Sequence, residues 1–563
     1  MSFPLQPLPR TSLALPSICQ KTLTLSSPTH LHLCLPLIHK PTSIHFHVMK
    51  KSLILIALLA ASTNAALVSF HVIAPGATTV QVSINSKNTT LTAADPSVPH
   101  FTGAAEADDG AKYKYVVNDE VEPFERTLKA GVSKTQNDFF KRPVTYADIP
   151  HLPSIEPIWE RSGPKQALFD SNYIPTIWVE ADRTEVNTLV KKPHINWIKG
   201  AKVTFILADE EKTFTGVNFG IHGAGKKNNN AKQSWRWELA GGDSFANRNY
   251  FKLRHMEEDP TQIREKLYAD VARALGTYAN EANMVRLFIN GVGFGTFNLL
   301  DDITQYSYPK AMFYAGNPPG PMGALFDGQS GASFAVDSSG AYDAWVKSPA
   351  SPEEVTAIGP LCAAWKGVVK TDDAQIADFS KQFDVDHFLR FMIMEYLTGH
   401  WDGYWMGRTN DGVYRDPTMS NMWFYLGQDF DATFGVNIPE DYPRLYDWSY
   451  KDYPGNFTEA VMINGLLENP TQRTTFEQYL RKTVEVLFNN VVLTNRILAL
   501  HDFYLPDLEW DRGIKQLSPG INFGWTMKEV KANLREGVSA PNDNGGGAEY
   551  GLIEWIIKKA AAV

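Results

Sequence analysis

Apolar and polar residues alternate with a period of two through much of 66–150, a pattern that is typical of half-buried strands. Turn signals at Pro75-Gly76 and Asn118-Asp119 separate the runs. Short strands at this spacing predict a small β-sandwich of the early-set, immunoglobulin-like kind. Such a domain could bind sugar, but because sandwich folds host many functions the pattern favours a structural spacer. The apolar positions of three runs are Val68, Phe70 and Val72; Val80, Val82 and Ile84; and Tyr113, Tyr115 and Val117.

A proline-rich stretch at 149–157 separates this region from a second domain, which we place at 167–563. Its first part carries strand-like runs and one helix, with Asp259 as the expected N-cap, Pro260 at the first helical position and Gly276 at the end. Its second part is rich in helical patterns, so the chain as a whole is predicted to be α+β. The predicted strands cover 175–179, 202–207, 231–237, 284–289 and 296–300, and the predicted helices cover 260–275 and 385–397.

The first 65 residues follow neither period. Residues 1–48 contain no acidic residue, whereas Met49-Lys50-Lys51 opens an apolar run that closes on small residues before Ala66. A basic start, a short apolar run and a small-residue cleavage site are typical of a secretory signal peptide, and the run is too short to cross a membrane. We therefore interpret 1–48 as an upstream extension of the gene model and 49–65 as the signal peptide. A basic, serine-rich organelle-targeting leader is the alternative for 1–48.

Charge and cysteine content narrow the class of protein. Residues 1–65 hold five basic residues and no acid, so the net charge of −9 for the whole chain becomes −14 for 66–563. An acidic chain without a basic stripe is not expected to bind nucleic acid. Cys362 is the only cysteine after residue 65, which excludes an internal disulfide in the mature chain. Sequons at Asn88 and Asn456 are compatible with secretion.

The last residues, 551–563, place Leu552, Trp555 and Ile556 at helical spacing and interrupt the apolar run with Lys558-Lys559. This pattern predicts an amphipathic closing helix rather than the uninterrupted hydrophobic tail of a lipid-anchor signal. We expect a secreted or cell-surface protein that has no transmembrane segment in its mature chain and no apparent lipid-anchor signal.

Three carboxylates are the main candidates for chemistry. Asp402 follows the apolar helical pattern of 385–397, and Asp429 and Asp431 follow a strand-like run. Metal-assisted phosphoryl transfer needs such a supply, with one carboxylate orienting a hydroxyl group and another holding a divalent cation. Taken singly, an Asp after Trp is more often a helix cap and an Asp-x-Asp pair is more often turn chemistry.

A glycine-rich segment at 220–227 nearly matches a phosphate-binding P-loop, but Lys227 stands where that motif has Ser or Thr. Three asparagines follow, which is typical of a loop rather than a helix start. We interpret the segment as a flexible loop over a phosphate site, and a solvated hairpin tip is the alternative. The alternating strand 231–237 then carries Lys232 toward whatever the loop covers.

Taken in order, these residues resemble the CotH kinases, the spore-coat-protein-H family, over roughly 173–555. Two segments, 223–238 and 406–418, look specifically like the Mucorales branch, whose members act as cell-surface invasins toward mammalian cells. The resemblance implies a small β-sandwich followed by an atypical two-lobed protein-kinase-like domain that uses ATP and Mg²⁺ or Mn²⁺. The matching motifs are Ala231-Lys232-Gln-Ser-Trp-Arg, Asp259-Pro-Thr-Gln-Ile-Arg264, Leu287-Phe-Ile-Asn-Gly-Val-Gly-Phe-Gly-Thr-Phe-Asn-Leu-Leu-Asp301, Trp401-Asp402-Gly-Tyr and Asp429-Phe-Asp431-Ala-Thr-Phe-Gly.

The resemblance also assigns roles to single residues. Asp402 becomes the catalytic residue that positions the acceptor hydroxyl, Asp429 becomes the metal ligand, and Asp431 is a second metal ligand or a structural carboxylate. Lys232 becomes the lysine on the nucleotide phosphates. Its rivals are Lys227 and Lys226 in the preceding loop.

Two positions depart from the family pattern. Asp301 stands where the family usually has Glu, near the hinge between the lobes, where it is expected to contribute to the nucleotide site. Gly407 stands five residues after Asp402, where many members have an Asn that could bind a second Mg²⁺. Asn410 or Asp411 would have to supply that ligand.

Three classes of function follow. The first is a secreted or surface kinase that phosphorylates Ser and Thr hydroxyls of proteins. The second is a weak kinase or pseudokinase that serves as an adhesin and binds a mammalian host receptor through the 406–418 loop. The third is a metal-dependent phosphohydrolase, against which the lack of a histidine-rich metal set argues.

Overall fold

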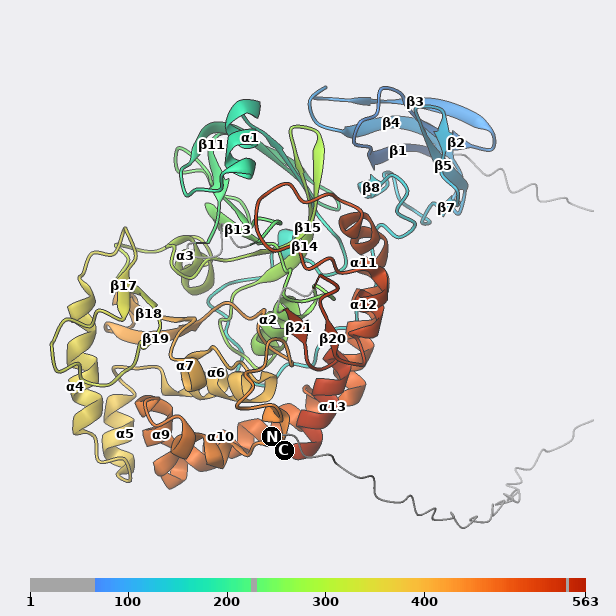
Figure 1. Cartoon of the computed structure of the whole chain (residues 1–563). Coiled ribbons are helices and arrows are strands. Elements are labelled where there is room, and N and C mark those ends of the chain that lie inside the picture. Colours follow the sequence, from blue (N-terminus) through green and yellow to red (C-terminus); the bar gives the residue numbers. More distant parts are fainter. Residues whose placement is uncertain (1–65, 224–229, 543–545) are drawn as a thin grey trace, which may run out of the picture. The chain divides into compact units, whose positions relative to one another are not determined.

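The computed structural model describes residues 66–223, 230–542 and 546–563, which form an α+β chain (Figure 1). The predicted extension at 1–48, the predicted signal peptide at 49–65 and the candidate residue Lys227 lie outside these ranges. Within them, none of the helices combines the length and apolar character that crossing a bilayer requires.

The N-terminal strands form one hydrogen-bonded sheet in the order β6-β5-β2-β3-β4-β1-β8, with β7 beside β5. The apolar residues of all three predicted alternating runs pack into a single core, which confirms the alternation. The two halves of the sheet therefore pack face to face as in a sandwich, although β3 pairs with both β2 and β4 and joins the halves. The strands are β1 (Ala66–Ile73), β2 (Val80–Ile84), β3 (Lys87–Ala93), β4 (His100–Ala107), β5 (Lys112–Val117), β6 (Glu120–Val121), β7 (Arg126–Thr127) and β8 (Asp138–Phe139).

Seven strands of the second region close into a barrel in the order β10-β11-β12-β13-β15-β14-β9. Closure leaves no exposed sheet edge, and the inward residues fill the interior as a core. Residues Asn290 and Gly291, in the turn between β14 and β15, both have positive φ, 52° and 81°, as a tight hairpin turn requires. The strands are β9 (Thr176–Glu180), β10 (Ile198–Ile206), β11 (Glu211–Ile221), β12 (Trp235–Glu238), β13 (Tyr250–Arg254), β14 (Ala282–Ile289) and β15 (Val292–Leu300).

Strand β13 presents two different faces, and this positions the site described below. Phe251 and Leu253 point into the barrel core, whereas Lys252 and Arg254 point outward and line a cavity. This is the period-two alternation of a strand. The sequence analysis did not predict β13, because its cationic residues fall on the outward face and are nevertheless buried.

Helix α2 (Arg264–Ala274) begins four residues later than predicted. Residues 260–263 form a turn instead, in which the Asp259 carboxylate accepts hydrogen bonds from the backbone N–H groups of Thr261, Ile263 and Arg264 at 2.9, 2.9 and 2.8 Å. Asp259 thus still satisfies the free N–H groups at the helix start, but from outside the usual N-cap position. The helix ends at Gly276 as predicted, where φ is +89°.

The second half is mainly helical around a four-stranded sheet in the order β17-β16-β18-β19. Closing helix α13 is amphipathic as predicted, and its Trp555 indole donates to the Leu397 carbonyl of α6 at 3.0 Å. Helix α1 (Arg183–Lys191) lies in the barrel region. The strands and main helices of the second half are α3 (Ser307–Tyr314), β16 (Leu325–Gly328), β17 (Trp345–Lys347), α4 (Gly359–Gly367), α5 (Asp373–Phe379), α6 (Val385–Thr398), α7 (Tyr404–Gly407), β18 (Asp411–Asp416), β19 (Met422–Gly427), α8 (Tyr453–Asn456), α9 (Val461–Glu468), α10 (Pro470–Val486), α11 (Asn490–Arg512), α12 (Met527–Ala532), β20 (Val538–Ser539), β21 (Gly547–Ala548) and α13 (Leu552–Ala562).

Helix α11 lies beside α13 (Figure 1) and ties the helical half to the barrel through Asp507. The Asp507 carboxylate accepts two hydrogen bonds from Arg286 of β14, at 2.7 and 2.8 Å, and one from Arg142, at 2.9 Å. Burial alone would raise the pKa of Asp507, but the two guanidinium groups outweigh it and hold the pKa below its ordinary value. The carboxylate is therefore charged and fully paired.

We expect Asp507→Asn to destabilise the protein by about 3–5 kcal/mol at pH 7, because two buried guanidinium groups would face a neutral amide. A carboxyl with a lowered folded-state pKa stabilises the fold above its ordinary pKa, and this contribution is lost as the pH falls. The difference between the variant and the wild type should therefore shrink in acid. Urea unfolding at pH 7 and pH 3 would measure it. Asp502→Asn on the exposed face of α11 is the matched control, and an equal loss there would contradict the assignment.

Candidate functional site

A cavity of about 460 Å³ lies between the outer face of the barrel and the helical half. The barrel contributes cationic side chains from β12 and β13, and the other wall contributes carboxylates and amides from the ends of β15, β16 and β19 and from the start of β18. The cavity brings the predicted residues Lys232, Asn410 and Asp429 together with three further cationic residues, Arg236, Lys252 and Arg254. Its polar lining residues include Arg236, Lys252, Arg254, Asp302, Asp327, Asn410, Gln428 and Asp429.

The loop that carries Asp402 is held by Glu395 near the end of α6. The buried Glu395 carboxylate accepts the backbone N–H groups of Tyr404 and Trp405, at 3.1 and 2.7 Å, and the Tyr425 hydroxyl at 2.8 Å. The Glu395 carboxylate therefore caps the N-terminus of α7. Burial raises the pKa of Glu395. A Cβ at Gly403 would lie 2.9 Å from the Glu395 carboxyl carbon, so this close approach requires glycine.

Asp402 is held on both sides within this loop. The Asn410 side-chain amide donates to the Asp402 carbonyl at 3.0 Å, and Nε2 of His400 lies 3.4 Å from Asp402 Oδ1. Burial raises the pKa of Asp402. Burial would lower the pKa of His400, but the interaction with Asp402 outweighs this and raises it. The contact with His400 is long, and no other described residue donates to Asp402 Oδ1.

The structure also explains the departure at Gly407. A Cβ at this position would lie 2.9 Å from the Cα of Asp402, so an asparagine would displace the loop. Of the two proposed substitutes, Asn410 lines the cavity in a left-handed conformation with φ of 55°. Asp411 instead is fully buried, and neither of its carboxyl oxygens has a donor in the described part of the chain.

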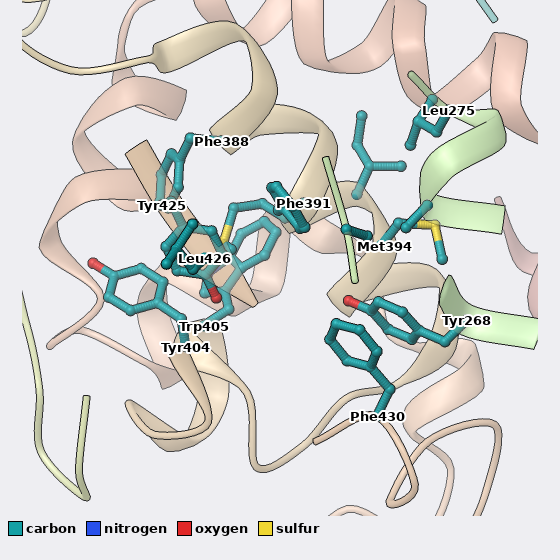
Figure 2. Packing of buried hydrophobic residues seen from close by; sticks show 14 of the residues in the cluster. Tyr268, Leu275, Phe388, Phe391, Met394, Tyr404, Trp405, Tyr425, Leu426 and Phe430 are labelled. Atoms are coloured by element: carbon teal, nitrogen blue, oxygen red, sulfur yellow. The ribbon is translucent and has the colours of Figure 1, made fainter. Parts of the chain in front are cut away.

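Asp429 follows β19 and has a φ of 61°, a conformation that Asp tolerates better than most residues. The next side chain, Phe430, stacks on Tyr268 of α2 with 3.8 Å between the ring centroids. Figure 2 shows the two rings facing each other. This packing fixes the loop at the edge of the cavity. Both Asp429 and Asp431 form ion pairs with Arg254.

Lys232 lines the cavity, but its charge is paired within the protein. Its ammonium donates to Asp511 of α11 at 2.6 Å and to the Thr296 carbonyl at 2.8 Å, and its side chain is only 1% exposed. Lys232 and Lys252 both line the cavity. The charge of Lys232 is paired within the protein, whereas Lys252 forms no ion pair with the described residues. The period-two alternation of β13 places Lys252 on the cavity side. This placement can be predicted only once the strand itself has been recognised.

Asp301, by contrast, points away from the cavity. Its carboxylate accepts two hydrogen bonds from Arg248, at 2.8 and 3.0 Å. The next residue, Asp302, lines the cavity and contacts His222 Nε2 at 2.9 Å. Successive side chains of an extended segment point to opposite sides, so a pair of adjacent acids offers one to each side.

The 406–418 segment is not the loop that the sequence analysis expected. Residues 411–416 form β18, between β16 and β19, and are mostly buried. The exposed part of the hairpin is its tip, 417–421, beyond the predicted segment for most of its length. The strand is required because β18 carries the core residues Val413 and Tyr414.

Asp327 is a cavity residue that no motif indicated. The Gln428 side-chain amide donates to it at 2.8 Å. Burial, together with the nearby negative charge of Asp302, raises its pKa to about 6, although its hydrogen bonds oppose the rise. Perturbed carboxyl groups in a cavity are common at functional sites.

The donor set fits a hard divalent cation that is bound together with phosphate. Among the described residues there is no group of three or more His, Cys, Asp or Glu side chains arranged to hold a metal alone. Mg²⁺, however, is usually bound by one or two carboxylates plus substrate phosphates and water. Asp429 and Asn410 offer oxygen ligands at the cavity wall, and Lys252 offers a positive charge for phosphate.

Comparison with known proteins gives a consistent result. Residues 219–526 match the family described as CotH kinase protein. The chain is 56% identical over 524 residues to "Invasin CotH3" of Rhizopus delemar, covering 92% of this chain and 87% of that protein. It is 55% identical to "Invasin CotH2" of the same organism, with 92% and 86% coverage. It is 21% identical over 286 residues to "Inner spore coat protein H" of Bacillus subtilis, with 49% and 73% coverage.

Asp327 gives a test of the cavity electrostatics. Because its folded-state pKa is raised from 3.8 to about 6, its ionisation destabilises the fold increasingly between these values and by a constant amount above them. We expect Asp327→Asn to be more stable than the wild type by roughly 1–2 kcal/mol at pH 8 and not at pH 3.5. Urea unfolding at both pH values measures this. The exposed Asp343→Asn should show no such difference, and an equal gain at both pH values would contradict the assignment.

Proposed function

Because this chain belongs to the CotH kinase protein family, in the Mucorales branch that contains the invasins, we propose that it is an atypical protein Ser/Thr kinase. It would transfer the γ-phosphate of ATP to protein hydroxyl groups. The observation that carries the proposal is the cavity in which Lys252, Asn410 and Asp429 meet, next to Asp402, whose backbone carbonyl accepts a hydrogen bond from Asn410. The barrel and the helical half would correspond to the two lobes of a kinase.

Each residue has a separate task in this proposal. Lys252 binds phosphate oxygens, while Asp429 and Asn410 hold Mg²⁺ or Mn²⁺. When bound, such a cation would supply positive charge to the phosphate groups. Asp402 accepts the hydrogen of the attacking Ser or Thr hydroxyl. A new bond forms between that oxygen and the γ-phosphorus, the bond to the ADP oxygen breaks, and the proton passes through Asp402 to solvent. Burial, which raises the pKa of Asp402, suits it to accept a proton.

A second concavity, of about 370 Å³, offers an approach for the acceptor protein. Trp401 and residues 405, 406 and 408 line it, so Asp402 lies in the chain between residues of this concavity and Asn410 of the first cavity. Apolar surface from Phe457 and an ion pair between Arg408 and Glu459 complete the wall. A polypeptide segment bound here would bring a hydroxyl group toward Asp402 from the side opposite the nucleotide.

A second function is supported by the printed names of the relatives. Two proteins that are 55–56% identical over most of both chains are named invasins. We propose that this chain also acts at the cell surface or after secretion and contacts a host cell. The exposed hairpin tip at 417–421 is a better candidate contact than the buried strand β18. A scaffold whose kinase activity is weak or absent would serve this function equally well.

Separate roles for the two carboxylates predict different losses of function. Asp429→Asn should weaken Mg²⁺-dependent nucleotide binding by more than the roughly 10- to 100-fold that is typical of outer-shell partners of a metal. Asp402→Asn should spare binding and abolish phosphate transfer. Titration with a fluorescent ATP analogue, with and without Mg²⁺, and labelled-ATP transfer would measure these effects. Equal loss of binding in both variants would show that the roles are wrongly assigned.

The two lysines offer a matched pair. Lys252→Met should weaken binding of the ATP analogue by about 10- to 100-fold, as expected for the loss of a charged hydrogen-bond partner, and change the unfolding midpoint little. Lys232→Met should mainly destabilise the protein, by about 3–5 kcal/mol, because Asp511 would remain buried without its partner. Nucleotide titration and thermal unfolding of both variants would decide. The reverse pattern would restore Lys232 as the phosphate lysine.

A further inference from the structure

Arg254 has more carboxylates around it than it pairs with. Its guanidinium forms ion pairs with Asp429 and Asp431, yet its Nε has no acceptor within the described ranges. Glu265, in the first turn of α2, is fully buried. Neither oxygen of its carboxyl has a donor among the described residues. Burial raises the pKa of Glu265 to about 8, and the positive charge of Arg254 opposes this rise.

The unpaired, buried Glu265 carboxyl lowers the stability of the fold if the structure never changes. A buried polar group without a partner lowers stability, and native proteins contain few of them. An apolar or amide side chain at position 265 would avoid the cost. The first turn of α2 therefore keeps an acceptor that this arrangement of Arg254 does not use.

The ion pair with Asp429 is the one that metal binding would disturb. Arg254 Nη1 contacts Asp429 Oδ1, an oxygen that the proposed function assigns to a divalent cation. A guanidinium and a metal ion are both positive and cannot share that oxygen closely. On metal binding Arg254 must therefore leave Asp429 or keep the metal out.

We propose that Glu265 is the second partner of Arg254: when a divalent cation binds Asp429, the guanidinium moves to the Glu265 carboxylate. The inference rests on the proposed function, because it takes Asp429 as a metal ligand. Glu265 is then a positioning residue that sets the divalent-cation affinity without touching the metal or the substrate. Arg254 keeps Asp429 paired while the metal is absent.

The surroundings favour movement of the arginine side chain rather than of α2. Arg264, next to Glu265, is held by the Asp259 carboxylate at 2.6 Å and by the Asn533 side-chain oxygen at 2.7 Å. Phe430 packs on Tyr268 one turn further along α2. The start of α2 is thus fixed, whereas Arg254 has a long side chain at the last position of β13.

Binding of Mn²⁺ to the full chain without nucleotide tests the proposal, with the free-ion signal in electron paramagnetic resonance as the readout. We expect Glu265→Gln to bind Mn²⁺ about 10- to 100-fold more weakly than the wild type. Its unfolding midpoint without metal should not fall, because the substitution removes an unpaired buried carboxyl. Asp343→Asn is the control: it removes an exposed carboxyl outside the cavity lining and should leave Mn²⁺ affinity unchanged.

A double-mutant cycle separates exchange from simple loss of a negative charge. If Arg254 moves to Glu265, the effect of Glu265→Gln on Mn²⁺ affinity should disappear in an Arg254→Gln background. An equal weakening with and without Arg254 would overturn the proposal, and so would wild-type affinity in Glu265→Gln. Asp429→Asn tests the proposed metal site separately from the movement of Arg254. If that variant binds Mn²⁺ as the wild type does, the proposed metal site itself is wrong.

Discussion

Asp507 and Asp511 lie one turn apart on α11, and their buried ion pairs with Arg286 and Lys232 join this helix to the barrel. The same Asp511 also accepts the backbone N–H of Thr296 at 2.9 Å, so it holds both a side chain and the strand β15. Removing one partner from such a pair leaves an uncompensated buried charge, which costs far more than an exposed pair would. The orientation of the barrel against the helical half depends on this constraint. It leaves the outer face of β12 and β13, rather than that of β15, to form the cavity wall.

The position of the cavity on the outer face of β12 and β13 also explains how the cationic side chains are paired. All three cations Lys232, Lys252 and Arg254 line the cavity, but Lys232 is paired with Asp511 of α11 and Arg254 is paired with Asp429. A site of this kind can bind a polyanion only if its cations are not already paired. Lys252 meets that condition as it stands, and Arg254 meets it only when another carboxylate or a metal ion changes its pairing.

Local patterns predicted the strands and helices in which one face is apolar and buried. The three alternating runs of the N-terminal sheet, helix α6 and closing helix α13 were predicted because burial of one face is recorded in the residues themselves. Asp402, Asp429 and Asn410 were identified through the family resemblance, and the structure places them together. The ion pairs of Lys232 and Asp301 could not be predicted in the same way. Their partners, Asp511 and Arg248, lie 279 and 53 residues away, and no local pattern reports a tertiary ion pair. Strand β13 was missed because its buried outward face is cationic.

The glycine at position 407 shows how one departure from a family pattern can be balanced by another. Without a side chain there, the Asp402 backbone packs directly against residue 407, with no room for a Cβ. The tight loop in turn brings Asn410 close enough for its amide to donate to the Asp402 carbonyl. Its side-chain oxygen is not used by that hydrogen bond and is available to the cavity. Gly407 and Asn410 therefore act together on the same loop: the glycine allows close packing on Asp402, and the asparagine holds the Asp402 carbonyl.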